Sequence, residues 1–112
     1  MQPIHSKKSL GQNFLTDRRI VGRIVESVNP QAADIILEIG PGKGALTVGL
    51  AENAGLLRAV ETDARLIDRL RASLPQDRVE IILADALEVD WASLIDSAVA
   101  DWRTKIGSGI SG

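Results

Sequence analysis

Short aliphatic runs that alternate with helix-like segments most constrain how this chain can fold. The runs occupy residues 35–39, 56–61 and 79–84. The first is nearly continuous in apolar residues and ends at Gly40, as is typical of a parallel strand covered on both faces. Strands and helices that alternate at this rhythm predict a parallel, doubly wound α/β sheet, whose ligand lies beyond the carboxyl ends of the strands.

Four helices are predicted around these strands, because a capping side chain or a glycine precedes each helical pattern. The predicted starting positions are Asp17 (or Thr16), Gly44 (or Ala45), Asp63 and Asp90. Gly55 is well placed to end the second helix in a left-handed conformation. The last helix is expected to reach Trp102.

Length and composition allow one compact domain, because the chain has 112 residues, of which 45% are hydrophobic and 25% charged. The absence of cysteine excludes disulfides, thiolate zinc sites and cysteine nucleophiles. No apolar run reaches the roughly 20 residues of a membrane helix, and the polar N-terminus lacks the apolar core of a secretory signal. We therefore expect a cytoplasmic protein with no membrane partner.

The charge is unevenly distributed along the chain. Five lysines and arginines and one aspartate lie among the first 25 residues, which gives +4 there and −6 over the remainder, for a net charge of −2. A basic arm of this kind favours contact with nucleic acid only weakly, because it is also typical of a solvated surface.

The stretch EIGPGKGAL places glycines at alternate positions directly after the first aliphatic run. It is not a P-loop, because Lys43 is followed by Gly44 and not by the serine or threonine that binds magnesium. Gly40, Gly42 and Ala45 do satisfy the dinucleotide pattern G-x-G-x-x-G/A. A nicotinamide-dependent oxidoreductase is therefore one interpretation of this turn.

Acidic residues around the turn favour S-adenosylmethionine instead. Pro41 removes a backbone donor that pyrophosphate would need, and Glu38 adds negative charge, which suits a sulfonium and an ammonium group better than a phosphate. Glu61 can bind ribose hydroxyls through charge-assisted hydrogen bonds. Asp85, which follows the third run, can accept a hydrogen bond from the adenine amino group at the same edge.

The segments KKSLGQNFL, EIGPGKGALT, AVETDARL and ADAL, in this order, resemble the bacterial small-subunit (16S) ribosomal RNA adenine N6,N6-dimethyltransferases over roughly residues 5–90. Gly-Gln-Asn-Phe-Leu is the most specific part, because generic methyltransferases and dehydrogenases lack it. The macrolide-resistance methyltransferases of the large subunit share Gln-Asn-Phe-Leu, whereas GPGKGALT and DAL look more like the small-subunit enzymes. The resemblance implies a Rossmann-like, class I S-adenosylmethionine-dependent methyltransferase fold.

The resemblance also implies which residues bind the cofactor, S-adenosylmethionine. Asn13 and Leu15 would cover it from the N-terminal side, and Gly40 would line its methionine end. Glu61 would bind the ribose hydroxyls, and Asp85 the adenine amino group. Further candidates beside them are Gln12, Gly42 and Ala86.

The implied reaction is transfer of two methyl groups to N6 of each of two adjacent adenosines in small-subunit ribosomal RNA, during ribosome maturation. In the family, an Asn-Leu-Pro-Tyr segment after the fourth strand orients N6 and stacks on the adenine. The 112 residues contain no such segment. No catalytic residue is therefore assigned, and the chain by itself is expected to transfer no methyl groups.

The expected organisation has a basic arm and helix at 1–33, the first half of a methyltransferase domain at 34–106 and a flexible tail at 107–112. The fold would then be truncated after about three parallel strands, with its C-terminal half and a helical RNA-binding domain absent. Half a sheet would expose one edge of its first strand. A non-catalytic RNA-binding module built on the basic arm is a third interpretation.

Overall fold

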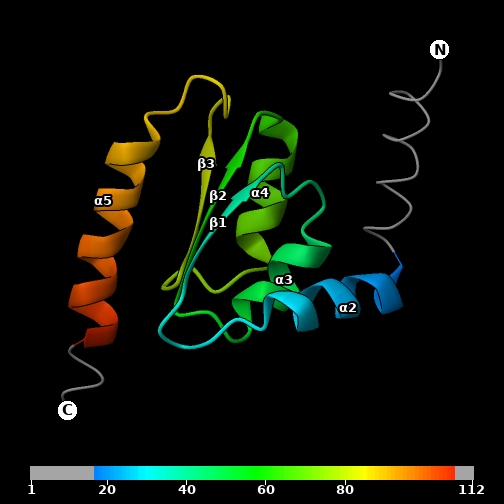
Figure 1. The fold of residues 1–112 in the computed structure, drawn as a ribbon. Coiled ribbons are helices and arrows are strands. Elements are labelled where there is room, and N and C mark those ends of the chain that lie inside the picture. Colours follow the sequence, from blue (N-terminus) through cyan, green and yellow to red (C-terminus); the bar gives the residue numbers. More distant parts are fainter. Residues whose placement is uncertain (1–16, 108–112) are drawn as a thin grey trace.

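In a computed structural model, which describes residues 17–107, the chain forms a parallel three-stranded sheet with helices on both faces (Figure 1). The elements are α2 (Arg18–Val28), β1 (Ile35–Ile39), α3 (Ala45–Ala51), β2 (Leu56–Glu61), α4 (Ala64–Ala72), β3 (Val79–Leu83), α5 (Trp91–Trp102) and the π-helix η1 (Arg103–Gly107). The α/β class and the order of strands and helices are confirmed.

Three of the predicted helix starts are capped by aspartate side chains. Asp17 accepts a hydrogen bond from the Arg19 N–H at the start of α2, and Asp63 accepts one from the Arg65 N–H at the start of α4. Asp90 caps α5 in the same way. Each carboxylate satisfies a backbone donor that the first turn of a helix leaves without a partner.

The main core lies between the sheet and the helices α3 and α4. The strand order is β1-β2-β3, with both pairs parallel, and all six residues of β2 are buried. Because successive side chains of a strand point to opposite faces, alternate residues of β2 and β3 contribute to this core. The buried cluster comprises Leu50, Ala51, Leu57, Ala59, Ile67, Leu70, Leu74, Val79 and Ile81.

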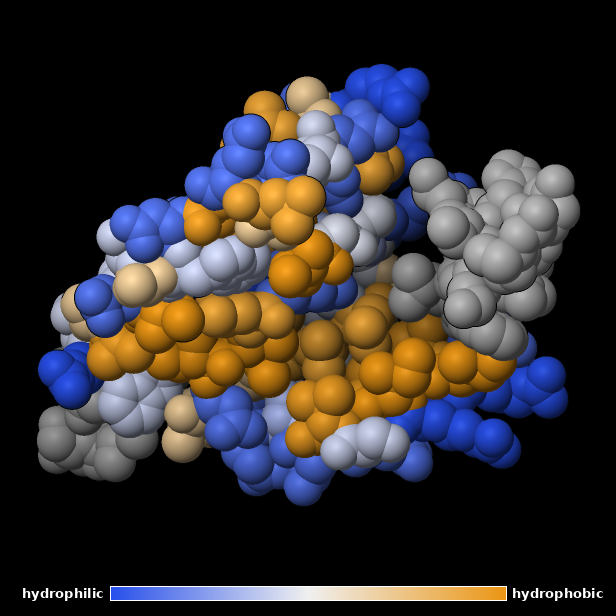
Figure 2. All heavy atoms as spheres, turned by 45° about the horizontal axis from the view of Figure 1, so that its top comes forward, coloured by the Kyte–Doolittle hydropathy of each residue, from blue (hydrophilic) through white to orange (hydrophobic). Residues whose placement is uncertain are grey.

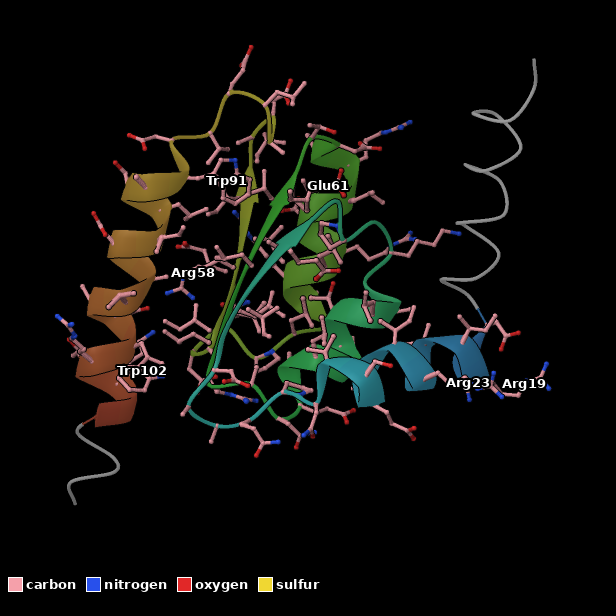
Figure 3. The ribbon with its side chains drawn as sticks, in the orientation of Figure 1. Arg19, Arg23, Arg58, Glu61, Trp91 and Trp102 are labelled. Atoms are coloured by element: carbon pink, nitrogen blue, oxygen red, sulfur yellow. The ribbon has the colours of Figure 1, made fainter. Side chains whose placement is uncertain are left out.

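The opposite face of β2 carries a buried arginine that attaches α5 to the sheet (Figure 3). The Arg58 side chain is 8% exposed and forms ion pairs with Asp101 of α5 and Glu80 of β3. Lys105 Nζ lies 3.4 Å from the same Asp101 carboxylate. The ion pair with Asp101 keeps the guanidinium charge from being buried without a partner.

One prediction about β1 is wrong, because this strand is not covered on both faces. Its residues Leu37 and Ile39 are 37% and 65% exposed. The strand forms an edge of the described sheet, as expected for half a sheet. The fully covered strand is β2. Figure 2 shows apolar side chains gathered in a band across one face of the molecule. The exposed large apolar residues are Val28, Leu37, Ile39, Val48, Leu83, Leu87 and Ile95.

The prediction that Gly55 ends the second helix in a left-handed conformation is also wrong. Among the described glycines, only Gly40, Gly42 and Gly44 have positive φ. Helix α3 ends earlier, and Arg78 Nη1 donates hydrogen bonds to the carbonyls of Ala51 and Ala54, at 2.9 and 3.2 Å. These carbonyls thus have a side-chain donor from the residue that directly precedes β3, which replaces the usual glycine motif.

Candidate functional site

The turns that follow the three strands lie together at the carboxyl edge of the sheet. The Gly40 N–H donates to the Val60 carbonyl at 2.8 Å, which joins the first turn to β2. The Ala84 N–H donates to the Glu61 carbonyl at 3.1 Å, which joins the third turn to the end of β2. The parallel register therefore brings the sequence candidates Gly40, Glu61 and Asp85 to one edge.

The first turn adopts a conformation that favours glycine at three alternate positions. Gly40, Gly42 and Gly44 have φ values of +67°, +59° and +89°, a region that side chains with a Cβ rarely adopt. A Cβ added at Gly44 would lie 2.6 Å from Leu70 Cδ2, whereas no described atom lies within 4 Å of one added at Gly40 or Gly42. The turn thus packs against α4 through Gly44 and is open at the other two glycines.

The Glu61 carboxylate connects the first and second turns (Figure 3). Its side chain is buried, and the residue is 6% exposed. Oε1 accepts a hydrogen bond from the Gly42 N–H at 3.0 Å, and Oε2 accepts one from the Asp63 N–H at 2.9 Å. A carboxylate has about four acceptor positions, so each oxygen retains capacity for another donor, such as a ribose hydroxyl.

A second carboxylate, Glu38, is held at the end of β1. Its Oε1 accepts a hydrogen bond from Thr47 Oγ1 of α3 at 2.7 Å, and Thr47 is fully buried. Burial raises the pKa of Glu38, an effect that the hydrogen bond from Thr47 only partly offsets. The sequence analysis named Glu38 only as nearby charge and did not find Thr47, although the threonine stands in the EIGPGKGALT segment.

Asp85 lies at the same edge but is less firmly held than Glu61. It is exposed, and its Oδ1 accepts a hydrogen bond from the Leu87 N–H at 2.8 Å. Within residues 17–107, its carboxylate forms no hydrogen bond with the glycine turn. The loop beyond it is fixed by Trp91, whose Nε1 donates to the Ala86 carbonyl at 2.9 Å.

Three candidates from the sequence, Gln12, Asn13 and Leu15, lie outside the described residues. The basic helix α2 is described, and Figure 3 shows Arg19 and Arg23 at its outer end, away from the sheet. Across residues 17–107, no group of three or more histidine, cysteine, aspartate or glutamate side chains could hold a metal ion.

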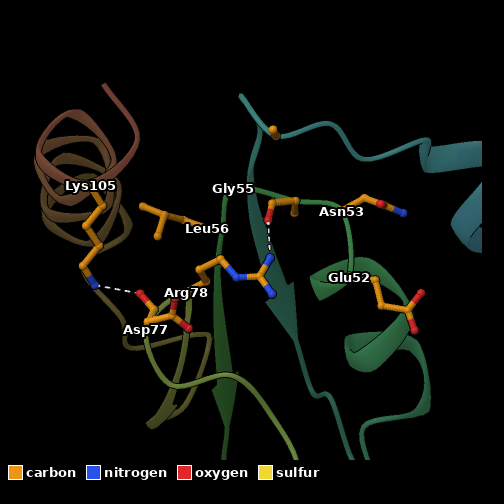
Figure 4. A pocket seen from close by; sticks show the side chains of 9 residues that line it. Glu52, Asn53, Gly55, Leu56, Asp77, Arg78 and Lys105 are labelled. Atoms are coloured by element: carbon orange, nitrogen blue, oxygen red, sulfur yellow. Dashed lines mark hydrogen bonds between the residues drawn. The ribbon is translucent and has the colours of Figure 1, made fainter. Parts of the chain in front are cut away.

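A cavity of about 730 Å³ lies at the opposite, amino edge of the sheet (Figure 4). Its cationic residues are engaged in the fold: Arg78 binds the carbonyls at the end of α3, and Lys105 donates to the Asp77 carbonyl at 2.8 Å. This cavity is therefore separate from the turns that carry the candidate residues. No helix in the described part of the chain is long and apolar enough to cross a membrane.

The chemistry of the carboxyl edge fits S-adenosylmethionine. Glu61 offers acceptors for two ribose hydroxyls, and Glu38 and Asp85 keep the surroundings acidic, which suits a cationic ligand. Pyrophosphate fits less well, because the Gly42 N–H already donates to Glu61.

Comparison with known proteins points to the same chemistry. A family model described as ribosomal RNA adenine dimethylase matches residues 4–108. The Geobacter sulfurreducens protein named ribosomal RNA small subunit methyltransferase A is 54% identical over 88 residues, which are 78% of this chain and 32% of that protein. The chain thus spans about a third of the length of the relatives it matches.

Solved structures with similar folds are also RNA methyltransferases. The 23S rRNA methyltransferase ErmE has a TM-score of 0.59 and 30% identity, covering 80% of this chain and 41% of its own. An RNA methyltransferase from Salinibacter ruber in complex with S-adenosyl-L-homocysteine has a TM-score of 0.59 and 25% identity, covering 67% and 52%. The Rossmann-like class I methyltransferase fold is thereby confirmed.

Proposed function

Because this chain belongs to the ribosomal RNA adenine dimethylase family, we propose that its carboxyl edge binds the S-adenosylmethionine of an enzyme that dimethylates adenosine in ribosomal RNA. The observation that carries the proposal is the buried Glu61 carboxylate, which joins two turns of that edge and retains acceptor capacity. Its two oxygens would accept hydrogen bonds from the ribose hydroxyls.

Other residues of the edge would complete the site. Gly40 would line the methionine end, because its open side allows close approach of a ligand. Asp85 would accept the adenine amino group through Oδ2, which accepts no hydrogen bond within the described residues. Asn13 and Leu15 are proposed to cover the cofactor on the strength of the family resemblance alone.

The proposed substrate is a pair of adjacent adenosines in small-subunit ribosomal RNA, methylated at N6 while the subunit is assembled in the cytoplasm. The relatives' names, ribosomal RNA small subunit methyltransferase A, support the choice of subunit. Bound S-adenosylmethionine supplies the electrophilic methyl group. The protein's part is to hold an unstacked base in line with it, and positioning of this kind lowers barriers by up to about 7–11 kcal/mol.

We further propose that the 112-residue chain binds cofactor without transferring methyl groups by itself. No residue of the described edge is assigned to orient the target adenine of the RNA, and the Asn-Leu-Pro-Tyr segment that does so in the family is absent from the sequence. Incubation with undermethylated small subunits and labelled S-adenosylmethionine should give no labelled RNA. Methyl transfer above background would contradict this part of the proposal.

Calorimetric titration tests the cofactor assignment directly. We expect the chain to bind S-adenosylhomocysteine but not NADH, and Glu61→Ala to abolish the binding. Glu52→Ala is a matched control, because Glu52 is exposed and lines the cavity at the other edge of the sheet. Binding of NADH without binding of S-adenosylhomocysteine would refute the assignment and favour the oxidoreductase interpretation.

The RNA-binding interpretation is tested with the same Glu61→Ala variant. If the chain acted only through its basic arm, RNA affinity would persist in the variant and fall steeply with salt, as phosphate contacts require. We expect the chain without this substitution to bind cofactor as well, which the RNA-binding interpretation does not predict.

A further inference from the structure

We infer that Glu61 has a second role, which rests on the proposed function: its carboxylate is a latch that positions the glycine turn for the methionine end of the cofactor. A residue that only bound ribose would act on the adenosine half alone. The latch would connect both halves of the ligand through one buried side chain.

The hydrogen bonds of Glu61 give it this position. Gly42 and Asp63 donate from different turns, 19 and 2 residues away along the chain, and each donates to a different oxygen, at 3.0 and 2.9 Å. Gly42 has a φ of +59° and lies in the open part of the turn. No packing against a neighbouring side chain therefore fixes this part of the turn, and the bond to Glu61 is the contact that we infer to orient it.

The two roles are chemically compatible. Hydrogen bonds from backbone N–H groups to a carboxylate are charge-assisted and stronger than those between neutral groups. With one acceptor position of each oxygen used, the two bonds fix the orientation of the carboxylate before a ligand arrives, and each oxygen keeps a further acceptor position. A site organised in advance avoids the ordering cost of binding.

Two ligands separate the roles. S-adenosylhomocysteine contains adenosine and the amino-acid chain, whereas 5′-methylthioadenosine contains adenosine and the sulfur only. If Glu61 bound ribose alone, Glu61→Gln would weaken both ligands by the same factor. With the latch, S-adenosylhomocysteine should lose about two- to tenfold more affinity than methylthioadenosine, as expected for one additional hydrogen bond. Equal factors would overturn the latch.

Hydrogen exchange of the ligand-free chain gives an independent readout. In Glu61→Gln, the side-chain amide group cannot accept from both backbone donors, so exchange at Gly42 or Asp63 should become about tenfold faster. Asp85→Asn is the matched control and should leave both amides unchanged, because Asp85 bonds neither. Unchanged exchange in Glu61→Gln would refute the latch even if both ligands bound normally.

These results distinguish the latch from the proposed function. Faster exchange without binding of either ligand would overturn the proposed cofactor and retain the contact between the turns. If Glu61→Gln fails to fold, Glu61→Asp serves instead, because the shorter carboxylate keeps its charge but cannot reach both donors. Normal exchange at both amides in that variant would also refute the latch.

Discussion

Gly44→Ala should destabilise the protein more than the same substitution elsewhere in the glycine turn. Gly44 has a φ of +89°, and an added Cβ would lie 2.6 Å from Leu70 Cδ2. Leu70 is 1% exposed and belongs to the core, so it cannot move aside without disturbing its neighbours.

The expected loss has two parts. A left-handed conformation costs a residue with a Cβ about 1–2 kcal/mol, and overpacking a core by one methyl group costs about 1–3 kcal/mol. Gly44→Ala should therefore lower the free energy of unfolding by about 2–5 kcal/mol. Gly42→Ala is the matched control: φ is +59° there, no described atom is close, and only the first part applies.

Urea unfolding followed by circular dichroism measures the difference between the two variants. A double variant with Leu70→Val adds a second comparison, because valine lacks the δ-carbon that the new methyl group would meet. The combined loss should then be smaller than the sum of the single losses. Equal destabilisation by Gly44→Ala and Gly42→Ala would refute the steric argument.

Three further predictions concern the surrounding fold. The pKa of Glu38 is raised above its usual 4.5, so the folded state binds a proton more readily than the unfolded state. Stability should therefore fall as pH rises from about 4.5 through the folded-state pKa, and urea titrations of Glu38→Gln should lack this fall. Gly22→Ala should stabilise α2 by about 0.5–1 kcal/mol. Gly49→Ala should instead destabilise the protein, because its Cβ would lie 2.7 Å from a methyl group of α2. Thermal melts of the two variants compare these effects. Asp101→Ala should lower the free energy of unfolding more than Arg58→Met does, as measured by urea unfolding. The alanine removes the closest partner of the buried guanidinium and leaves its charge, whereas the methionine removes the charge itself.

Local signals explain why most of the elements could be predicted. The run before Gly40 and the aspartates at the helix starts act through neighbouring residues, so they are readable without the fold. The exceptions involve distant contacts. Arg78, which directly precedes β3, donates to carbonyls at the end of α3, and nothing near Gly55 in the sequence indicates this.

In the candidate site, too, local signals predicted the positions of residues, whereas distant contacts could not be predicted. The positions of Glu61 and Asp85 after aliphatic runs predict that they share an edge, because parallel strands end on the same side. Their different burial could not be predicted. Glu61 is enclosed and binds two turns, whereas Asp85 is exposed and closes its own loop. The partner of Glu38 was missed because Thr47 reaches it across the interface between β1 and α3.

The sequence by itself determined the α/β order of elements, the carboxyl edge as the position of the candidate residues and the family that the motifs resemble. These properties follow from the periodicity of side chains and from short motifs, which act over a few residues. Tertiary structure alone decided that β2 and not β1 is the fully covered strand, that Arg58 is buried against α5 and that one carboxylate joins Gly42 to Asp63. Each of these depends on groups far apart in the chain, whose approach is set by packing and not by local preference.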